Sequence, residues 1–357
     1  MQLRGYKHGT MRHALVLCVA SCAYAFAPWR VAPSRPRGAA PGARRGAARA
    51  APAMAALSPG DSVLVLGSGP VMAITAKQCV AAGYKTTIIG GVDAPKYREM
   101  MFSADSPAPP QSDLAILESV EGEQFSVYNT IATSCDGVIV ANDRELVPSD
   151  SMLDTMIPPA NINLKRVVVM SRNLNGKGLG PFAMASKISA NAEVWAGGAK
   201  IAEYEAFEAK VRAKAAEVGG DCDCVIVRAG TLKGGGPGDS TTTEGAPAAQ
   251  TLTKAFYDQY SRDIVNWPLL FDAATLGVSL TPGDTAEGPG FQAAFTATSD
   301  GACKGDSSRV NVASALVRAL GRDGVAWQDF GVTTAAGRNS PTDAEWDAEF
   351  AKVLAGA

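Results

Sequence analysis

"SVLVLGSGPVMAITAKQCVAAGYKTTIIGG", residues 62–91, contains the pattern that decides the fold. It opens with a short apolar run, 63–66, which is typical of a strand buried in a parallel sheet. The turn sequence GSGP follows, then a helical pattern over 71–82 and a second β-branched run over 85–89. Strand, glycine turn, helix and strand in this order predict a βαβ unit with its glycines at the start of the helix.

The glycine turn predicts a phosphate-binding loop. Gly67 permits a tight turn after the strand, and Gly69 lacks a Cβ, so the backbone can approach a diphosphate closely. The helix that follows offers N–H groups and the positive end of its dipole to the anion. Met72 stands where this fingerprint expects a third glycine, so a glycine turn without a ligand is the alternative. The candidate cofactor-binding residues of the turn are Gly67, Ser68, Gly69, Pro70 and Val71.

Strands and helices alternate along the rest of the chain. Further strands are predicted over 114–120, 137–141, 166–170 and 225–228, and helices over 96–102, 124–134, 149–156, 193–218, 248–262, 310–320 and 343–354. This alternation predicts an α/β fold with a doubly wound parallel sheet. We expect the dinucleotide-binding domain over 58–335, a substrate-side insertion within it over about 234–305, and a C-terminal helical region over 336–357.

The end of the second predicted strand bears on the choice of cofactor. An acid at this place would bind a ribose 2′-OH, but the chain has Gly90 and Gly91 there. Lys96 and Arg98 follow, and they could pair with a 2′-phosphate. This favours NADP over NAD, unless the two cations form only a solvated helix face.

The first 54 residues have the composition of a targeting segment. They contain no Asp or Glu, they carry nine Lys and Arg, and their one apolar stretch, 14–27, is too short to span a bilayer comfortably. These features predict a signal peptide over 1–25 and an Arg-, Ala- and Pro-rich, disordered transit peptide over 26–57. No transmembrane segment is expected in the mature protein.

The junction "AYAFAP" resembles the bipartite plastid-targeting presequence of algae with secondary red plastids. In those proteins the signal peptide is cleaved just before a Phe, here Phe26. The resemblance implies import into the chloroplast stroma. The alternative is a secreted protein with a basic pro-segment.

Removal of the presequence would make the protein acidic. Of 33 Lys and Arg residues, nine lie before residue 55, which leaves 24 against 35 Asp and Glu, a net charge of about −11. Nucleic acid is therefore not an expected partner, because phosphate contacts need a basic surface.

The cysteines and histidines do not predict a metal centre or a disulfide framework. Five of the seven cysteines follow the presequence, and they are odd in number and scattered. Both histidines lie in the presequence. Cys222 and Cys224 would share one face of a strand, so a redox-controlled thiol pair is a second interpretation of those two residues.

Several stretches, in order, resemble the atypical short-chain dehydrogenase/reductases of the NmrA-like, NAD(P)-binding branch. They are "VLVLGSGPV", "SCDGVIVAND", "RVVVMS", "CVIVRAGTL" and "SSRVNVASALVRAL", and they cover about 60–235 and 305–335. The resemblance implies a Rossmann fold and an active-site Ser171 at the end of a strand. It also implies cofactor contacts from Ala141, Asn142, Arg228, Ala229 and Gly230.

The chain departs from this superfamily at the proton donor. Reducing members use a Tyr with a Lys four residues later, which lowers the pKa of the phenol. Here Tyr204 has Glu208 at that place, and a carboxylate raises the pKa of a phenol. Lys200 and Glu203 match the Lys and Glu pair of the atypical branch, so the resemblance implies that Lys200 holds the nicotinamide ribose or donates the proton. Tyr204 lies on the apolar stripe of its helix and is predicted to be a core residue.

Two functions follow from these residues. The first is an NADP(H)-dependent oxidoreductase of the plastid that acts on a small molecule, with Ser171 and Lys200 as catalytic residues. The second is a nucleotide-binding redox sensor or assembly factor without turnover, which would have a plastid protein as its partner. A structural protein with an empty cleft is a third class.

Overall fold

The computed structural model describes residues 56–90, 93–104, 106–118, 123–143, 147–173, 198–218, 222–240, 244–260, 275–284 and 306–356. The predicted signal peptide, and the transit peptide up to residue 55, lie outside these ranges. No helix in the described ranges is long and apolar enough to cross a membrane.

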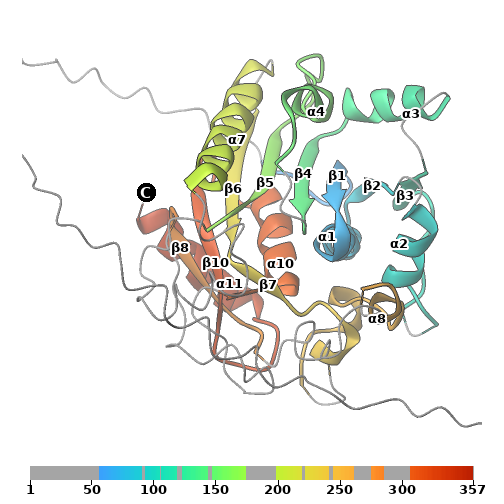
Figure 1. Cartoon of the computed structure of the whole chain (residues 1–357), viewed down its shortest axis with the longest axis vertical. Helices are drawn as coiled ribbons and strands as arrows, with labels where there is room; N and C mark the ends of the chain where they lie inside the picture. Colours follow the sequence, from blue (N-terminus) through green and yellow to red (C-terminus); the bar gives the residue numbers. More distant parts are fainter. Residues whose placement is uncertain are drawn as a thin grey trace, which may run out of the picture. The chain divides into compact units, whose positions relative to one another are not determined.

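The described strands form one eight-stranded sheet with the order β3-β2-β1-β4-β5-β6-β10-β8 (Figure 1). The strands are β1 (Ser62–Ser68), β2 (Lys85–Ile89), β3 (Leu114–Leu117), β4 (Gly137–Asn142), β5 (Arg166–Arg172), β6 (Asp223–Ala229), β8 (Gly277–Pro282) and β10 (Asp329–Ala335). All neighbours pair in parallel except β8, which runs antiparallel to β10 at the edge. The predicted doubly wound parallel sheet is confirmed.

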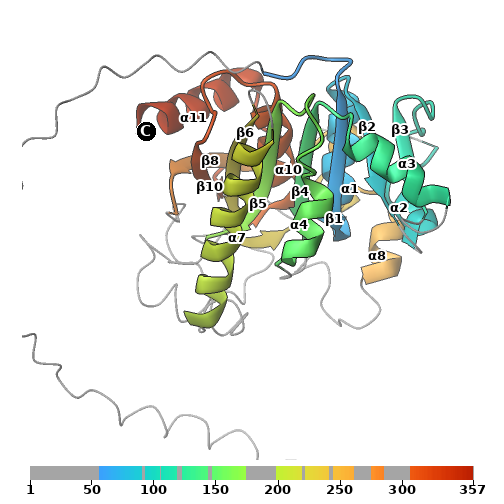
Figure 2. The same ribbon diagram turned by 90° about the horizontal axis from the view of Figure 1, so that it is seen from above.

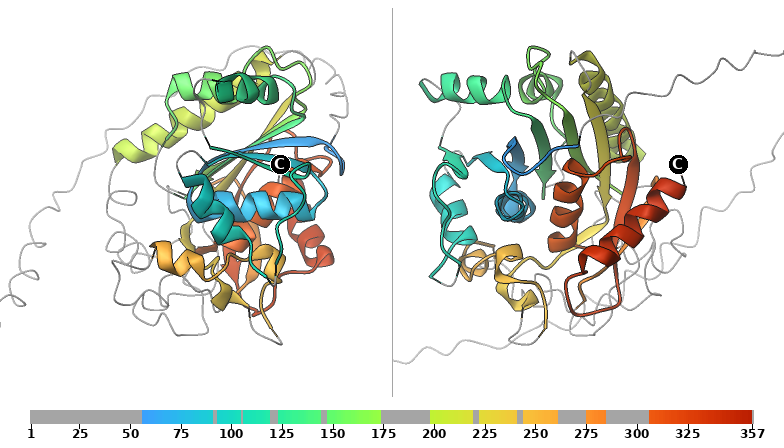
Figure 3. Two further views of the ribbon diagram at one scale, coloured as in Figure 1. Left: turned by 90° about the vertical axis from the view of Figure 1, so that its right-hand side faces the viewer. Right: turned by 180° about the vertical axis from the view of Figure 1, so that it is seen from behind.

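Helices cover both faces of the sheet (Figure 2; Figure 3, left). One face carries α1 (Gly69–Ala81), α2 (Ala94–Met101) and α10 (Arg309–Leu320), and the other carries α3 (Glu123–Ala132), α4 (Asp150–Met156) and α7 (Gly198–Glu217). The short helix α8 (Ala255–Tyr260) contacts α2, and α11 (Asp343–Ala355) packs on β8. A separate parallel pair joins β7 (Thr231–Lys233) to β9 (Asp306–Ser308).

Two apolar cores lie on the two faces, and the strand residues alternate between them. Val63 and Val65 belong to the core under α1 and α10, while Leu64 and Leu66 belong to the core under α4 and α7. A strand buried on both faces reads as a continuous apolar run. This is why 63–66 could be assigned from the sequence.

Some predicted elements differ from the structure. The helix expected over 248–262 is wrong in its first half, because a 3-10 turn (Ala248–Gln250) precedes α8, which begins at Ala255. The ammonium of Lys77, buried in α1, donates to the carbonyl oxygens of Ala248 and Thr251 at 2.8 Å each, which holds this segment as a turn. β8 and β10 were not predicted from the sequence, and β8 lies inside the predicted substrate-side insertion.

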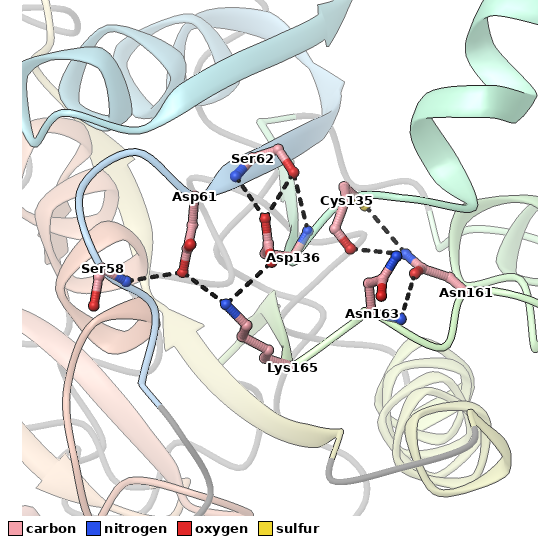
Figure 4. Close-up of polar contacts among 8 residues, drawn as sticks. All are labelled: Ser58, Asp61, Ser62, Cys135, Asp136, Asn161, Asn163 and Lys165. Atoms are coloured by element: carbon pink, nitrogen blue, oxygen red, sulfur yellow. Dashed lines mark hydrogen bonds and ion pairs between the residues drawn. The ribbon is translucent and has the colours of Figure 1, made fainter.

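Polar contacts join the amino ends of three strands (Figure 4). The Lys165 ammonium lies 3.0 Å from an Asp61 carboxylate oxygen and 3.1 Å from an Asp136 oxygen, and Asp136 also accepts hydrogen bonds from the N–H and hydroxyl of Ser62. Burial alone would raise the pKa of Asp136, but the Ser62 hydrogen bonds and the Lys165 charge lower it below its usual value. The charged groups of Asp61, Asp136 and Lys165 are therefore paired with one another.

Arg166 fixes the same edge from within. Its guanidinium pairs with Asp223 at 2.7 and 2.8 Å, and both side chains are fully buried. Its remaining nitrogen donates to the carbonyl oxygens of Ala319, Leu320 and Arg322, at the end of α10. One side chain therefore joins β5, β6 and the last turn of α10.

The described thiols are buried. Burial raises the pKa of Cys222 to about 12, and it raises that of Cys224 as well. A redox pair needs an accessible thiolate, so the structure gives no support to that interpretation. Among the described residues no group of three or more His, Cys, Asp or Glu side chains could hold a metal ion.

Candidate functional site

The strand order reverses at β1, which has β2 on one side and β4 on the other. In doubly wound sheets ligands bind at such a point, beyond the carboxyl ends of the strands. The register brings Gly67 beside Ala141 and Ser68 beside Asn142. The Ser68 hydroxyl donates to the side-chain oxygen of Asn142 at 2.5 Å. Four predicted cofactor-binding residues therefore lie together at this edge.

Gly67 is required by the neighbouring strand. It has a φ of +133°, and a Cβ there would lie 1.8 Å from the backbone oxygen of Ala141. Gly69 has a φ of +80°, and its Cβ would lie 2.7 Å from the Cβ of Asp143. Both glycines thus permit a close approach between the turn and the end of β4, whether or not a ligand is bound.

The first turn of α1 is partly engaged by the protein. The N–H of Gly69 donates to the hydroxyl of the buried Tyr97 at 3.0 Å, and Pro70 has no N–H. Val71 is fully buried. A diphosphate at this helix start would compete with Tyr97 for the Gly69 N–H. Tyr97 was not predicted from the sequence, because its position beside the turn depends on the packing of α2 on α1.

A partly buried ion pair lies beside the glycine turn. The Arg309 guanidinium, at the start of α10, contacts the Asp143 carboxylate at 2.8 and 3.3 Å and the carbonyl oxygen of Gly234 at 3.0 Å. Arg172 donates to the backbone oxygens of Asp143 (2.9 Å) and Gly230 (3.3 Å). Two cations and one carboxylate therefore lie at the mouth of α1. The contact between Asp143 and Arg309 was not predicted from the sequence, in which they are 166 residues apart.

Two polar side chains at the end of β5 differ from those at the amino edge in their hydrogen bonding. Ser171 is 1 % exposed and Asn173 is fully buried. Among the described side chains, the hydroxyl of Ser171 and both polar atoms of the Asn173 amide have no hydrogen-bond partner. Buried polar groups are nearly always paired, so each exception calls for a reason.

The strand alternation places these groups on the face that α7 covers. Val167 and Val169 belong to the core under α7, so Ser171 and the extended Asn173 continue the same series along β5. Figure 1 shows α7 beside β5 and β6. Lys200 lies in the first turn of α7, and its side chain is outside the described part of the chain.

The predicted core position of Tyr204 is confirmed, since it is 4 % exposed and packs in the core under α7. Glu208, one turn later, receives the Arg228 guanidinium at 2.9 and 2.6 Å, and Arg228 also pairs with Asp329. The Arg228 guanidinium is therefore engaged by two carboxylates, while its cofactor contact stays a prediction.

The remaining predicted residues divide between the edge of the sheet and the surface. Ala229 ends β6, and the N–H of Gly230 donates to the Ser307 hydroxyl at 2.8 Å. Lys96 and Arg98 lie on the exposed side of α2, and the Lys96 ammonium is 2.7 Å from Asp93. Their contact with a 2′-phosphate stays a prediction.

A cleft of about 740 Å³ lies elsewhere, at the far ends of α1 and α10. Several of its polar side chains are paired: Arg318 with Asp343, Arg322 with Asp347, and Ser314 with Gln78. Its size alone does not mark it as a substrate site, and the unpaired groups at the end of β5 make the carboxyl edge the stronger candidate.

No protein-family model and no curated protein matches the sequence. Solved structures share parts of the arrangement at low identity. BdcA in complex with NADPH is 12 % identical, with 78 % of this chain and 96 % of that chain covered and a TM-score of 0.37. NmrA, a negative transcriptional regulator in complex with NADP, is 13 % identical, with 49 % and 47 % covered and a TM-score of 0.30. Likeness at this level carries no conclusion about what this chain binds.

Proposed function

We propose that the chain binds a nicotinamide dinucleotide across the carboxyl ends of β1, β4, β5 and β6. The observation that carries the proposal is the reversal of strand order at β1, where Gly67 packs against Ala141 and the glycine turn enters α1. The diphosphate would lie at this turn, and the nicotinamide would lie toward Ser171 and α7.

The charges at the turn fit a diphosphate under one condition. Arg309 and Arg172 supply positive charge at the mouth of α1, and charge-assisted hydrogen bonds from arginine hold phosphates well. The negative charge of the Asp143 carboxylate would repel a diphosphate at this turn unless Arg309 neutralises the carboxylate. We infer that Arg309 is the main cation of the site, and that Lys96 and Arg98 favour NADP over NAD.

We propose an oxidoreductase acting on a small molecule as the activity. The cofactor would supply the hydride. Ser171, whose hydroxyl is buried and unpaired, would hold the substrate oxygen, and Lys200 would hold the ribose or donate the proton. Tyr204 is not the proton donor in this proposal, because it is enclosed in the apolar core.

A second candidate is a nucleotide-binding sensor or assembly factor of the plastid without turnover. Glu208 favours it, because the position of the usual lysine carries a carboxylate that Arg228 neutralises. Turnover distinguishes the two candidates. An oxidoreductase would consume NADPH when a substrate is supplied. A sensor would bind NADPH without consuming it, and a pull-down would recover its protein partner.

Titration with NADPH tests the cofactor proposal. We expect the melting temperature of the protein to rise, because a ligand present at a hundredfold excess over its Kd stabilises the folded state by about 2.7 kcal/mol. Replacement Arg309→Met should weaken binding by about tenfold, since it removes a charged contact and exposes the diphosphate to Asp143. Arg318→Met, at the other end of the same helix, is the matched control and should leave the affinity unchanged. A flat titration with NADPH and with NADH would refute the proposal.

We also propose import into a plastid, on the composition of residues 1–57. A fluorescent reporter carrying these residues should accumulate in the plastid of an alga with a secondary red plastid. Secretion of the reporter into the medium would instead support the basic pro-segment.

A further inference from the structure

The amide of Asn173 is a buried polar group. The residue is fully buried, and within the described part of the chain neither its amide nitrogen nor its amide oxygen has a hydrogen-bond partner. An enclosed amide that has lost its water contacts without replacing them destabilises the folded state. Stability of the free protein therefore does not explain this side chain.

Another buried asparagine of this chain shows the ordinary situation. Asn161, also fully buried, donates to the carbonyl oxygens of Ala132 and Cys135 at 3.0 and 2.9 Å, and its oxygen accepts from the N–H of Asn163 at 3.0 Å (Figure 4). Asn161 lies near the amino edge of the sheet. The unpaired amide lies at the carboxyl edge, where the proposed function places the cofactor.

The backbone fixes where the Asn173 amide lies. The N–H of Asn173 donates to the carbonyl oxygen of Ala229 at 2.9 Å, which extends the pairing of β5 with β6 by one residue. Ser171, two residues earlier, shares its face of the strand and is also unpaired. The two side chains thus follow one another along the end of β5.

We propose that Asn173 binds the carboxamide of the nicotinamide ring. This inference rests on the proposed dinucleotide binding and adds the residue that positions its reactive end. An asparagine amide offers one acceptor and a donor side by side, and a primary carboxamide offers the complementary donor and acceptor. Two hydrogen bonds between the amides would satisfy both unpaired atoms of Asn173. A ketone or aldehyde oxygen would satisfy only the nitrogen, so it fits the single hydroxyl of Ser171 better.

Substitution of Asn173 should affect the affinity for NADP⁺ but not the stability of the free protein. Leucine has nearly the shape of asparagine and no polar atom, so Asn173→Leu should leave the melting temperature of the free protein unchanged or raise it. The same variant should weaken NADP⁺ binding by about tenfold or more. Binding of 2′-phospho-ADP-ribose, which lacks the nicotinamide, should not change. The matched control Asn161→Leu should lower the melting temperature and leave both affinities unchanged.

A ligand series on the unmodified protein gives an independent measurement. The 3-acetylpyridine analogue of NADP⁺ keeps the carbonyl oxygen and lacks the amide N–H. The wild-type protein should bind this analogue several-fold more weakly than NADP⁺, and Asn173→Leu should bind the two equally. The comparison of the two ligands on the wild-type protein remains a valid test even if the variant does not fold.

Three results would overturn the proposal. The first is a loss of stability in Asn173→Leu like that in Asn161→Leu, with an unchanged affinity ratio between NADP⁺ and 2′-phospho-ADP-ribose. The second is equal binding of NADP⁺ and its acetylpyridine analogue by the wild-type protein. In both cases binding of 2′-phospho-ADP-ribose would leave the proposed function standing. The third is binding of none of these ligands, which overturns the proposed function as well.

Discussion

Replacement of Gly67 by alanine is expected to lower the free energy of unfolding by about 3 kcal/mol or more. The new Cβ would lie 1.8 Å from the backbone oxygen of Ala141, and a φ of +133° is strained for any residue with a side chain. The backbone atoms of β4 cannot move aside as a flexible side chain would, so β1 and β4 must separate. Urea unfolding of the wild type and of Gly67→Ala measures the difference.

Gly60→Ala is the matched control, because Gly60 also has a positive φ, +97°, but nothing lies within 4 Å of its Cβ position. It should cost only the backbone strain, about 1–2 kcal/mol. Gly67→Ala should also weaken NADPH binding, since the turn that faces the diphosphate moves with β1. Equal midpoints for the two variants would show that the contact with Ala141 is not as close as described.

Replacement of Arg166 by methionine should lower the free energy of unfolding by about 3–5 kcal/mol, because it leaves the Asp223 carboxylate buried without a counter-charge. Both side chains of this pair are fully buried. The three carbonyl oxygens at the end of α10 would lose their donor in the same step. Urea unfolding gives the size of the effect.

The double variant Arg166→Met, Asp223→Leu should recover part of this loss, because it removes the unpaired charge but not the unpaired carbonyl oxygens. Lys210→Met, which breaks a pair that is 50 % and 71 % exposed, should cost no more than about 1 kcal/mol. If Arg166→Met unfolded at the same urea concentration as Lys210→Met, the Arg166 pair would not be the buried junction described above.

The sequence predicted the strands whose own residues show by their apolar or β-branched character that they are buried. The runs 63–66 and 137–141 are apolar on both faces, and 85–89 is rich in β-branched residues; the structure places them in β1, β4 and β2. β10 was missed because its sequence, DFGVTTA, has glycine and threonine among few apolar residues. It becomes a strand because it pairs with β6 and β8. This pairing joins segments that are distant in the sequence, so the local pattern does not predict it.

The candidate site divides in the same way. Gly67, Ser68 and Gly69 were predicted because a turn between a strand and a helix is a local pattern. Asp143 and Arg309 were not, since their contact joins residues 166 positions apart. The unpaired amide of Asn173 could not be predicted either, because an asparagine in a sequence carries no sign of whether it will find a hydrogen-bond partner.

The sequence by itself therefore determined the α/β class, the parallel sheet and the place of the glycine turn, because hydrophobic periodicity and backbone freedom are properties of neighbouring residues. The tertiary structure alone decided that Tyr97 takes the N–H of Gly69, that Arg309 neutralises Asp143 and that the Asn173 amide has no hydrogen-bond partner among the described residues. Such contacts depend on which distant side chains the packed sheet and helices bring within hydrogen-bonding distance. In the core the same packing also excludes the water that would otherwise form hydrogen bonds with the polar groups.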